Sequence, residues 1–210
     1  MQEWLRQFKL SKVIAIVRGI EPGMARPLFA ALAEGGIRYA EVTLNTPDAL
    51  PIIHEMREAY GERMSIGAGT VLTVKQAEEA IQAGAEFLIS PHVDADIIRL
   101  ALSRDVPPLP GAMTPTEIVQ AVHAGALAVK VFPCSSLGPG YIKELRGPLA
   151  HIEMIAVGGI TKENAAAYME AGAVGVGIGG SLISLPKMKE GRYNEITAYA
   201  KQLHESMQHL

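Results

Sequence analysis

Three charged side chains interrupt apolar runs of this sequence, and each is of a type that can do chemistry. Arg18 ends KVIAIVR, Glu41 stands inside YAEVTL and Lys130 stands inside LAVKVFP. Continuous apolar runs of this kind are typical of buried strands, where lysine is almost never fully buried without a partner or a task. If the three strands end at one face, two cations and one carboxylate share a partly desolvated cavity.

This combination favours Schiff-base chemistry. Burial and a nearby guanidinium both lower the pKa of a lysine, and a neutral amine is a nucleophile toward ketones. Glu41 can move the protons that this step requires, and Arg18 can hold a substrate carboxylate in a bidentate grip. The alternative is a buried ion pair of Glu41 with Lys130 or Arg18, which adds little stability because desolvation offsets the attraction.

Two glycine doublets predict a phosphate site. They occur in AVGGIT and GIGGSL and comprise Gly158 with Gly159 and Gly179 with Gly180, the second followed by Ser181. Glycine at a strand end lets backbone N–H groups approach an anion, and a following helix N-terminus adds its dipole. The alternative is that both doublets are only tight turns between strands and helices.

A further glycine-rich stretch, GAGT (67–70), does not predict a dinucleotide site. It lacks the third glycine and the acidic ribose partner of that fingerprint. We expect its glycines to leave room near the cavity and Thr70 to offer a hydroxyl group.

Two other groups of reactive side chains are interpreted as structural. His92, Asp94 and Asp96 in SPHVDAD fit a helix cap with a nearby histidine better than a metal site. Cys134 follows the strand that carries Lys130, has no histidine near it in sequence, and is expected to be a small loop residue. Neither a metal nor a cofactor is therefore expected.

Alternating strands and helices must position these residues. Helix starts are predicted at three capping patterns, which are Thr46-Pro47, Thr73 to Gln76 and Thr114 to Glu117. Eight apolar runs are predicted to be strands, the fifth being the weakest because of its prolines: KVIAIVR (12–18), YAEVTL (39–44), MSIGAG (64–69), EFLIS (86–90), PPLPG (107–111), LAVKVFP (127–133), EMIAVG (153–158) and VGVGIG (174–179).

One pattern repeats four times: a helix ends on glycine and a strand follows, as in EGGIRYAEV and QAGAEFLIS. The glycines stand at positions 36, 84, 125 and 172, and each gap has the length of about two strand–helix units. Eight such units predict a single α/β domain over residues 1–210, a (β/α)8 TIM barrel with an extra N-terminal helix (2–10) and a C-terminal helix (about 192–208). A doubly wound open sheet is the alternative.

The composition fits one soluble globular domain. The chain has 210 residues, of which 49% are hydrophobic, a formal net charge of −3 and one cysteine. Lysines and arginines are scattered, so neither nucleic acid nor an anionic membrane is an expected partner. The N-terminus is charged and lacks the apolar core of a signal peptide, and no apolar run is long enough to span a membrane. We therefore expect a cytoplasmic protein.

The motifs EVTLNT, GAGTVL, SPHVD, VKVFP, GGIT and GIGGSL, in this order and spacing, resemble a known family. It comprises the class I aldolases that cleave 2-keto-3-deoxy-6-phosphogluconate and its galactonate epimer, and includes 4-hydroxy-2-oxoglutarate aldolases. The similarity extends from about residue 12 to residue 183. It implies a (β/α)8 barrel, a homotrimer, no metal, and a phosphorylated 2-keto-3-deoxy sugar acid and pyruvate as the small-molecule partners.

The resemblance also implies roles for individual residues. Lys130 would be the Schiff-base lysine, Glu41 the proton shuttle, and Thr70 a ligand of the pyruvate carboxylate. The remaining expected pocket residues are Thr43, Asn45, Pro91, Phe132 and Val157. The phosphate would be received by Gly158, Gly159, Gly179, Gly180 and Ser181.

Two departures favour the galactonate epimer or relaxed stereochemistry. Many gluconate-type members have an arginine where this chain has Asn45, so that Arg18, in a stretch IVRGI like that of galactonate-type members, would hold the carboxylate. Gluconate-type members typically have a threonine where this chain has Val157, and valine removes that hydroxyl donor.

Two other functions compete with the aldolase. A phosphate-binding barrel isomerase would use Glu41 as a base and Lys130 as an electrostatic partner, and it would form no covalent adduct with pyruvate. A non-catalytic barrel module would be favoured if Lys130 or Glu41 were missing, and both are present.

Overall fold

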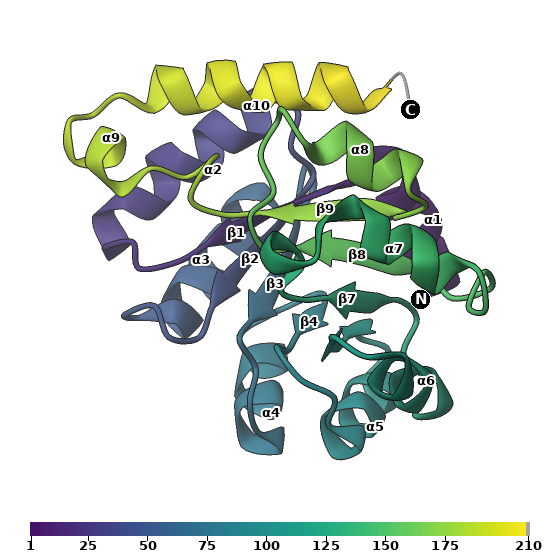
Figure 1. The fold of residues 1–210 in the computed structure, drawn as a ribbon. Coiled ribbons are helices and arrows are strands. Elements are labelled where there is room, and N and C mark those ends of the chain that lie inside the picture. Colours follow the sequence, from purple (N-terminus) through teal and green to yellow (C-terminus); the bar gives the residue numbers. More distant parts are fainter. Residues whose placement is uncertain (209–210) are drawn as a thin grey trace.

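The computed structural model describes residues 1–208, in which nine parallel strands form a barrel surrounded by helices (Figure 1). Hydrogen-bonded neighbours follow the order β5-β4-β3-β2-β1-β9-β8-β7-β6. The strands are β1 (Val13–Val17), β2 (Tyr39–Thr43), β3 (Ser65–Gly69), β4 (Leu88–Ile89), β5 (Pro108–Leu109), β6 (Gly111–Ala112), β7 (Val129–Val131), β8 (Met154–Val157) and β9 (Gly175–Ile178).

The barrel closes through the predicted strand PPLPG, which the structure divides into β5 and β6. These two strands stand at opposite ends of the strand order, and only Pro110 separates them in the chain. Leu109 pairs with Ile89 on one side, and Gly111 pairs with Lys130 on the other. Proline cannot donate a ladder hydrogen bond, which explains the break, although its carbonyl still accepts from the Lys130 N–H at 2.9 Å. The eight predicted strands and the barrel are confirmed, and the doubly wound alternative is excluded.

The helices cover the outside of the barrel, and α10 lies along α2 (Figure 1). Each of the four repeat glycines adopts a positive φ, between 87° and 105°, so the predicted left-handed helix ends are confirmed. The helices are α1 (Gln2–Ser11), α2 (Ala25–Glu34), α3 (Ala49–Tyr60), α4 (Val74–Gln82), α5 (Ala95–Ser103), α6 (Pro115–His123), α7 (Gly138–Arg146), α8 (Ala165–Glu170), α9 (Leu185–Lys189) and α10 (Tyr193–Gln208), with short 3-10 turns at Pro22–Met24 and Cys134–Ser136.

Two of the three predicted helix starts are confirmed. Thr114 and Glu117 form a complete capping box at α6, and the Thr73 hydroxyl accepts from the Gln76 N–H at α4. The third is wrong: α3 begins at Ala49, after a left-handed Asp48, and the Thr46 side chain does not cap it. The Thr46 hydroxyl instead accepts a hydrogen bond from the Gly19 N–H at 3.0 Å.

The extra N-terminal helix closes one end of the barrel. Trp4 and Phe8 of α1 stack on each other and contact Tyr39, the first residue of β2, with ring centroids 5.2 to 5.5 Å apart. Phe87 contacts Trp4 in the same cluster, and the Trp4 indole N–H donates to the Ser65 hydroxyl at the start of β3. This plug occupies the N-terminal ends of the strands, which leaves the C-terminal ends for a site.

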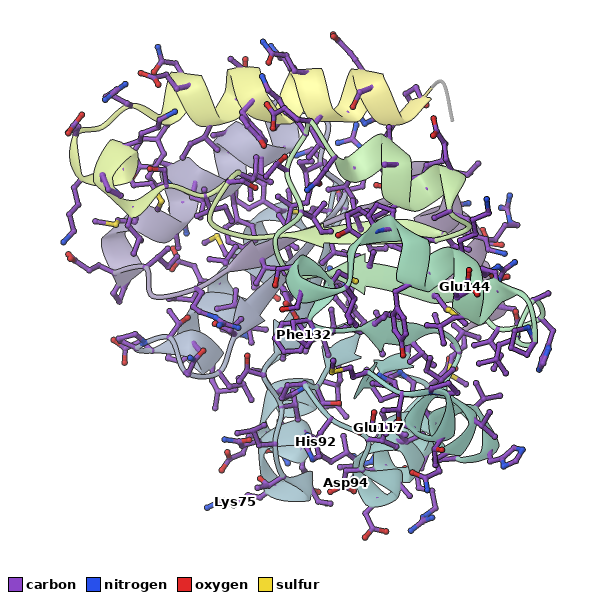
Figure 2. The ribbon with its side chains drawn as sticks, viewed as in Figure 1. Lys75, His92, Asp94, Glu117, Phe132 and Glu144 are labelled. Atoms are coloured by element: carbon purple, nitrogen blue, oxygen red, sulfur yellow. The ribbon has the colours of Figure 1, made fainter. Side chains whose placement is uncertain are left out.

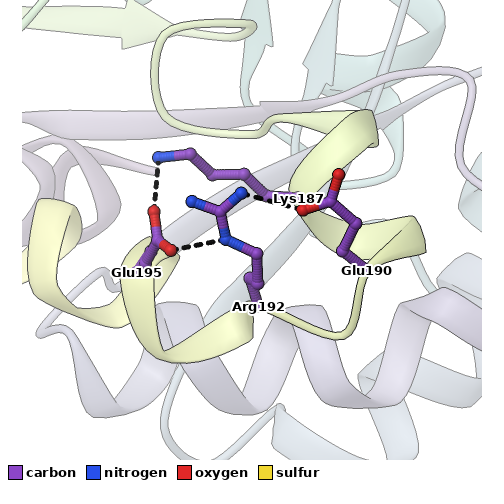
Figure 3. A network of polar contacts seen from close by, with 4 residues as sticks. All are labelled: Lys187, Glu190, Arg192 and Glu195. Carbon is purple, nitrogen blue, oxygen red and sulfur yellow. Dashed lines mark hydrogen bonds and ion pairs between the residues drawn. The ribbon is translucent and has the colours of Figure 1, made fainter.

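A network of exposed ion pairs joins α9 to the first turn of α10 (Figure 3). Glu195 accepts from Lys187 at 3.0 Å and from Arg192 at 2.6 Å, and Arg192 also pairs with Glu190 at 2.8 Å. Exposed pairs stabilise little individually, and this network links α9, which contains Leu185, to the start of α10.

Along residues 1–208, no helix is both long and apolar enough to cross a bilayer.

Candidate active site

A cavity of about 550 Å³ opens at the C-terminal ends of the strands. Arg18 from the end of β1, Glu41 from β2 and Lys130 from β7 all line it. The structure therefore brings together three charged residues that lie far apart in the sequence. The two glycine doublets line the same cavity as the charged groups.

Lys130 is the central residue of β7 and is only 6% exposed. Its Nζ atom lies 4.7 Å from the centroid of the Phe132 ring. Burial lowers the pKa of Lys130, the Glu41 carboxylate opposes this shift, and the Arg18 guanidinium adds to it. The net lowering favours the neutral amine, which is the form that attacks a ketone.

Glu41 is buried, 1% exposed, and within residues 1–208 its Oε2 atom has no hydrogen-bond partner. Burial raises the pKa of Glu41, while Lys130 and Arg18 act in the opposite direction. Among residues 1–208, no salt bridge joins Glu41 to Lys130 or Arg18. The structure therefore does not contain the buried ion pair that was the alternative. An unpartnered buried carboxyl oxygen is costly and is a feature of functional sites.

Gly69 of GAGT makes room for this carboxyl group. A Cβ atom built on Gly69 would lie 2.2 Å from Glu41 Oε2, so any larger residue would displace the carboxylate. Gly67 instead leaves room for the Phe87 ring, because a Cβ atom at that position would lie only 2.5 Å from it. The expectation that these glycines leave space near the cavity is confirmed for Gly69.

Arg18 lies at the rim and is exposed, in contrast to the expected partial desolvation. It is the first residue after β1, beyond the buried part of the barrel. Its Nη2 atom donates to the Thr70 hydroxyl at 3.3 Å. Thr70 has a left-handed backbone with φ of 57°, an uncommon conformation for a β-branched residue that is found at sites under functional constraint.

The loops after β8 and β9 carry the glycine doublets. Gly158 and Gly159 have positive φ values of 103° and 70°, and the Gly159 carbonyl accepts from the Asn164 side chain at 3.0 Å. The Ser181 hydroxyl donates to the Ile160 carbonyl at 2.8 Å, which ties the two loops together. A Cβ on Gly180 would meet no atom within 4 Å, so that loop leaves open space.

The expected contribution of a following helix dipole is wrong for both loops. The helix after the first doublet, α8, begins only at Ala165, and the helix after the second, α9, begins at Leu185. Turns at residues 162–164 and 180–182 occupy most of the chain between each doublet and the next helix, so neither doublet directly precedes a helix N-terminus.

The remaining expected pocket residues divide into two groups. Phe132 and Val157 line the cavity. Thr43, Asn45 and Pro91 lie outside its lining: Thr43 is fully buried, Asn45 is exposed, and the Pro91 backbone packs against Gly111 of β6.

Sequence reasoning missed several lining residues. The apolar wall was missed because its members are ordinary core types, although Ile16 could have been found from strand alternation, two residues before Arg18. Thr161 directly follows GGI, so the doublet itself could have pointed to it. The missed residues are Ile16, Gly19, Ile160, Thr161, Gly177, Ile183 and Leu185.

The groups interpreted as structural have structural partners. Asp94 caps α5 by accepting from the N–H groups of Asp96 and Ile97, and Figure 2 shows Asp94 and His92 near α4 and α5. Among residues 1–208, no group of three His, Cys, Asp or Glu side chains could hold a metal ion. Cys134 is buried, burial raises the pKa of its thiol, and Sγ donates to the Val131 carbonyl.

Comparison with known proteins agrees with this geometry. The family model described as KDPG and KHG aldolase matches residues 3–199. The 2-dehydro-3-deoxy-6-phosphogalactonate aldolase of Escherichia coli (strain K12) is 36% identical over 197 residues, which cover 93% of this chain and 96% of that protein. The chain therefore belongs to the KDPG and KHG aldolase family and is a lyase.

Two solved structures share the whole barrel. A native KDPGal structure has a TM-score of 0.86 and 36% identity, covering 93% of this chain and 96% of that chain. KDPG aldolase from Legionella pneumophila, with pyruvate captured at low pH as a covalent carbinolamine intermediate, has a TM-score of 0.85 and 29% identity, covering 93% and 95%.

Proposed function

We propose that this protein cleaves 2-keto-3-deoxy-6-phosphogalactonate or the gluconate epimer into pyruvate and glyceraldehyde 3-phosphate through a Schiff base on Lys130. The observation that carries the proposal is a buried lysine, with its pKa lowered, in one cavity with an unpartnered buried carboxyl group and two glycine doublets. The names of the relatives support the substrate class.

The reaction begins when the neutral Lys130 amine attacks the carbonyl at carbon 2. Glu41 shuttles protons as the carbinolamine loses water and becomes a protonated Schiff base. This iminium accepts the electron pair as the bond between carbons 3 and 4 breaks. Glu41, directly or through a water molecule, takes the proton from the hydroxyl on carbon 4, and the aldehyde leaves. The remaining enamine is protonated at carbon 3 and hydrolysed to pyruvate, which frees Lys130.

The other cavity residues orient the substrate. Arg18 holds the carboxylate at the rim together with Thr70, which lies outside the cavity lining and accepts a hydrogen bond from Arg18. The loops that contain Gly158, Gly159, Gly179, Gly180 and Ser181 receive the phosphate through backbone N–H groups. Binding energy from the distant phosphate helps to place the reacting bond. Cleavage of 4-hydroxy-2-oxoglutarate to pyruvate and glyoxylate would use the same chemistry without this contribution.

The lining supports a preference for the galactonate epimer or relaxed stereochemistry. Val157 lines the cavity without a hydroxyl donor, and Arg18 rather than Asn45 lies at its rim. Steady-state assays of the two epimers would test this, and a higher kcat/KM for the gluconate epimer would contradict it.

The resemblance further supports a cytoplasmic homotrimer that acts in Entner–Doudoroff-type breakdown of sugar acids. Sedimentation equilibrium tests the trimer, and a monomeric mass at micromolar concentration would contradict it.

Borohydride trapping tests the central proposal. The protein is incubated with pyruvate and reduced, and its intact mass and peptide map are recorded. We expect one pyruvyl adduct on the peptide that carries Lys130 and no adduct in Lys130→Ala, which should also lose turnover. Lys162→Ala, outside the cavity lining, is the control and should still be labelled. Absence of an adduct on folded wild-type protein would support the isomerase or the non-catalytic barrel instead.

A further inference from the structure

Two threonines of EVTLNT are buried next to the cavity without lining it. Thr43 is 0% exposed and Thr46 is 4% exposed. Thr46 was expected to cap α3 but does not, so capping does not explain why its hydroxyl group is buried. Buried hydroxyl groups are retained only when hydrogen bonds compensate their desolvation.

The two hydroxyl groups form a continuous chain of hydrogen bonds. The Gly19 N–H donates to Thr46 Oγ1 at 3.0 Å, the two threonine Oγ1 atoms are 3.1 Å apart, and Thr43 Oγ1 donates to the Val17 carbonyl at 3.3 Å. Each hydroxyl has one proton. Because the proton of Thr43 goes to Val17, the proton of Thr46 must go to Thr43.

The chain therefore begins and ends on the two residues that flank Arg18. It joins the carbonyl of Val17, the last residue of β1, to the N–H of Gly19, which lies beyond the end of the strand. Gly19 has a φ of 67°, so the backbone turns sharply at this point. Thr46 is itself held by its N–H, which donates to the Thr43 carbonyl at 2.8 Å.

Arg18 depends on this backbone restraint for its direction. Its side chain is exposed, and its hydrogen bond within residues 1–208 is the 3.3 Å contact with Thr70. An exposed arginine loses much rotamer freedom when it binds an anion, so a fixed Cα position reduces what must be ordered.

We propose that Thr43 and Thr46 are positioning residues that set the direction of Arg18 toward the substrate carboxylate. The inference rests on the proposed role of Arg18 in the Schiff-base reaction. Neither hydroxyl touches the substrate, and both act through the peptide groups on either side of Arg18.

Thr46→Val keeps the shape of the side chain and removes the acceptor of the Gly19 N–H. We expect the pyruvate concentration that gives half-maximal borohydride labelling of Lys130 to rise about tenfold, the scale of a misplaced binding group, with full labelling at saturation. Thr46→Ser keeps the hydroxyl and should restore the wild-type value. Thr197→Val, at a buried threonine of α10, is the matched control and should not change it.

A double-mutant cycle with Arg18→Ala distinguishes positioning from general loosening. If Thr46 acts through Arg18, the double variant should have the half-saturating concentration of Arg18→Ala alone. Thr43→Val breaks the same chain at the next link and should match Thr46→Val, which provides a second route if one variant folds poorly. Additive effects, an unchanged value in both valine variants, or an equal rise in Thr197→Val would overturn the inference. Failure of wild-type labelling would instead refute the proposed function.

Discussion

Lys130 and Glu41 are buried in one cavity in a state that favours their neutral forms. Burial is the largest influence on both, and it lowers the pKa of the amine while it raises the pKa of the carboxyl group. An ion pair would hold the proton on nitrogen and suppress nucleophilic attack. A lysine that is near a carboxyl group but not paired with it can attack a ketone and then receive help with proton transfer.

Glu41→Gln keeps the size of the side chain and removes its capacity to exchange protons. We expect cleavage to slow by roughly 10²- to 10⁴-fold, the usual contribution of a positioned acid–base group. The measurement is kcat with either epimer as substrate. Glu144→Gln, at the exposed glutamate of α7 labelled in Figure 2, is the control and should retain the wild-type rate. A Glu41→Gln enzyme within a few-fold of wild type would remove Glu41 from the mechanism.

The same substitution should change how stability depends on pH. In the unfolded chain Glu41 ionises near its ordinary value of 4.5, whereas the folded protein holds the proton to a higher pH. The folded state therefore binds more protons above that value, and wild-type stability falls as the pH rises toward the raised pKa. Glutamine removes this loss. Loss of the carboxylate also lowers the pKa of Lys130 further. This second change likewise makes Glu41→Gln gain stability relative to wild type as the pH rises.

We accordingly expect Glu41→Gln to be more stable than wild type at pH 8, and the difference to shrink toward pH 4.5, because the net effect of burial is to raise the pKa of Glu41. Urea unfolding at several pH values measures it. An advantage that stays constant or grows as the pH falls would contradict the assigned shift.

At the scale of the elements, strand β3 provides the space in which the Glu41 carboxyl group lies. Gly69→Ala would place a Cβ atom 2.2 Å from Oε2, so the carboxyl group must move while the strand persists. We expect kcat to fall at least about tenfold, because small displacements of a catalytic group are costly. Circular dichroism should show a retained barrel.

Gly140→Ala is the control for this substitution. The position lies in α7, and an added Cβ meets no atom within 4 Å. Activity should be unchanged, and stability should rise slightly because alanine is the better helix former. An active Gly69→Ala enzyme would show that Glu41 does not need its present position.

The sequence predicts those elements that depend on the conformational preferences and hydrophobicity of neighbouring residues. Apolar runs predicted the strands. Glycine after a helical pattern predicted four helix ends, and the positive φ values of these glycines confirm them. Thr46 shows the limit of such reasoning. Its position before a proline matches a capping pattern, but its hydroxyl is used by Gly19, which lies 27 residues away in sequence and becomes a neighbour only after β1 and β2 pair.

The candidate site was predictable to the same extent. A lysine and a glutamate within apolar strands are conspicuous, and a barrel brings their strand ends to one face. Three features of the site depend on how the loops fold over the barrel. They are the exposure of Arg18, the hydrogen bond from Ser181 to Ile160 and the position of Asn45 outside the cavity lining. No residue pattern within a single loop encodes these contacts.

At the scale of the whole molecule, the aromatic plug and the candidate site lie at opposite ends of the barrel axis. Phe8 of α1 is fully buried at the N-terminal end, against Trp4 and Tyr39, and an added Cβ on Gly175 would lie 2.4 Å from its ring. The charged residues lie at the opposite end, with the apolar interior of the barrel between them. Changes at the plug should therefore affect folding without affecting the site.

Phe8→Ala removes a large ring from a tightly packed position. We expect the free energy of unfolding to fall by about 3–5 kcal/mol, the usual cost of a phenylalanine cavity, while the pyruvate concentration for half-maximal labelling of Lys130 stays unchanged. Urea unfolding and borohydride labelling at a temperature where the variant is folded measure the two quantities. Phe8→Leu should lie between the variant and wild type in stability. A rise in the half-saturating pyruvate concentration that parallels the loss of stability would show that the two ends of the barrel are coupled, because only a displacement transmitted along the strands could move Lys130 or Glu41.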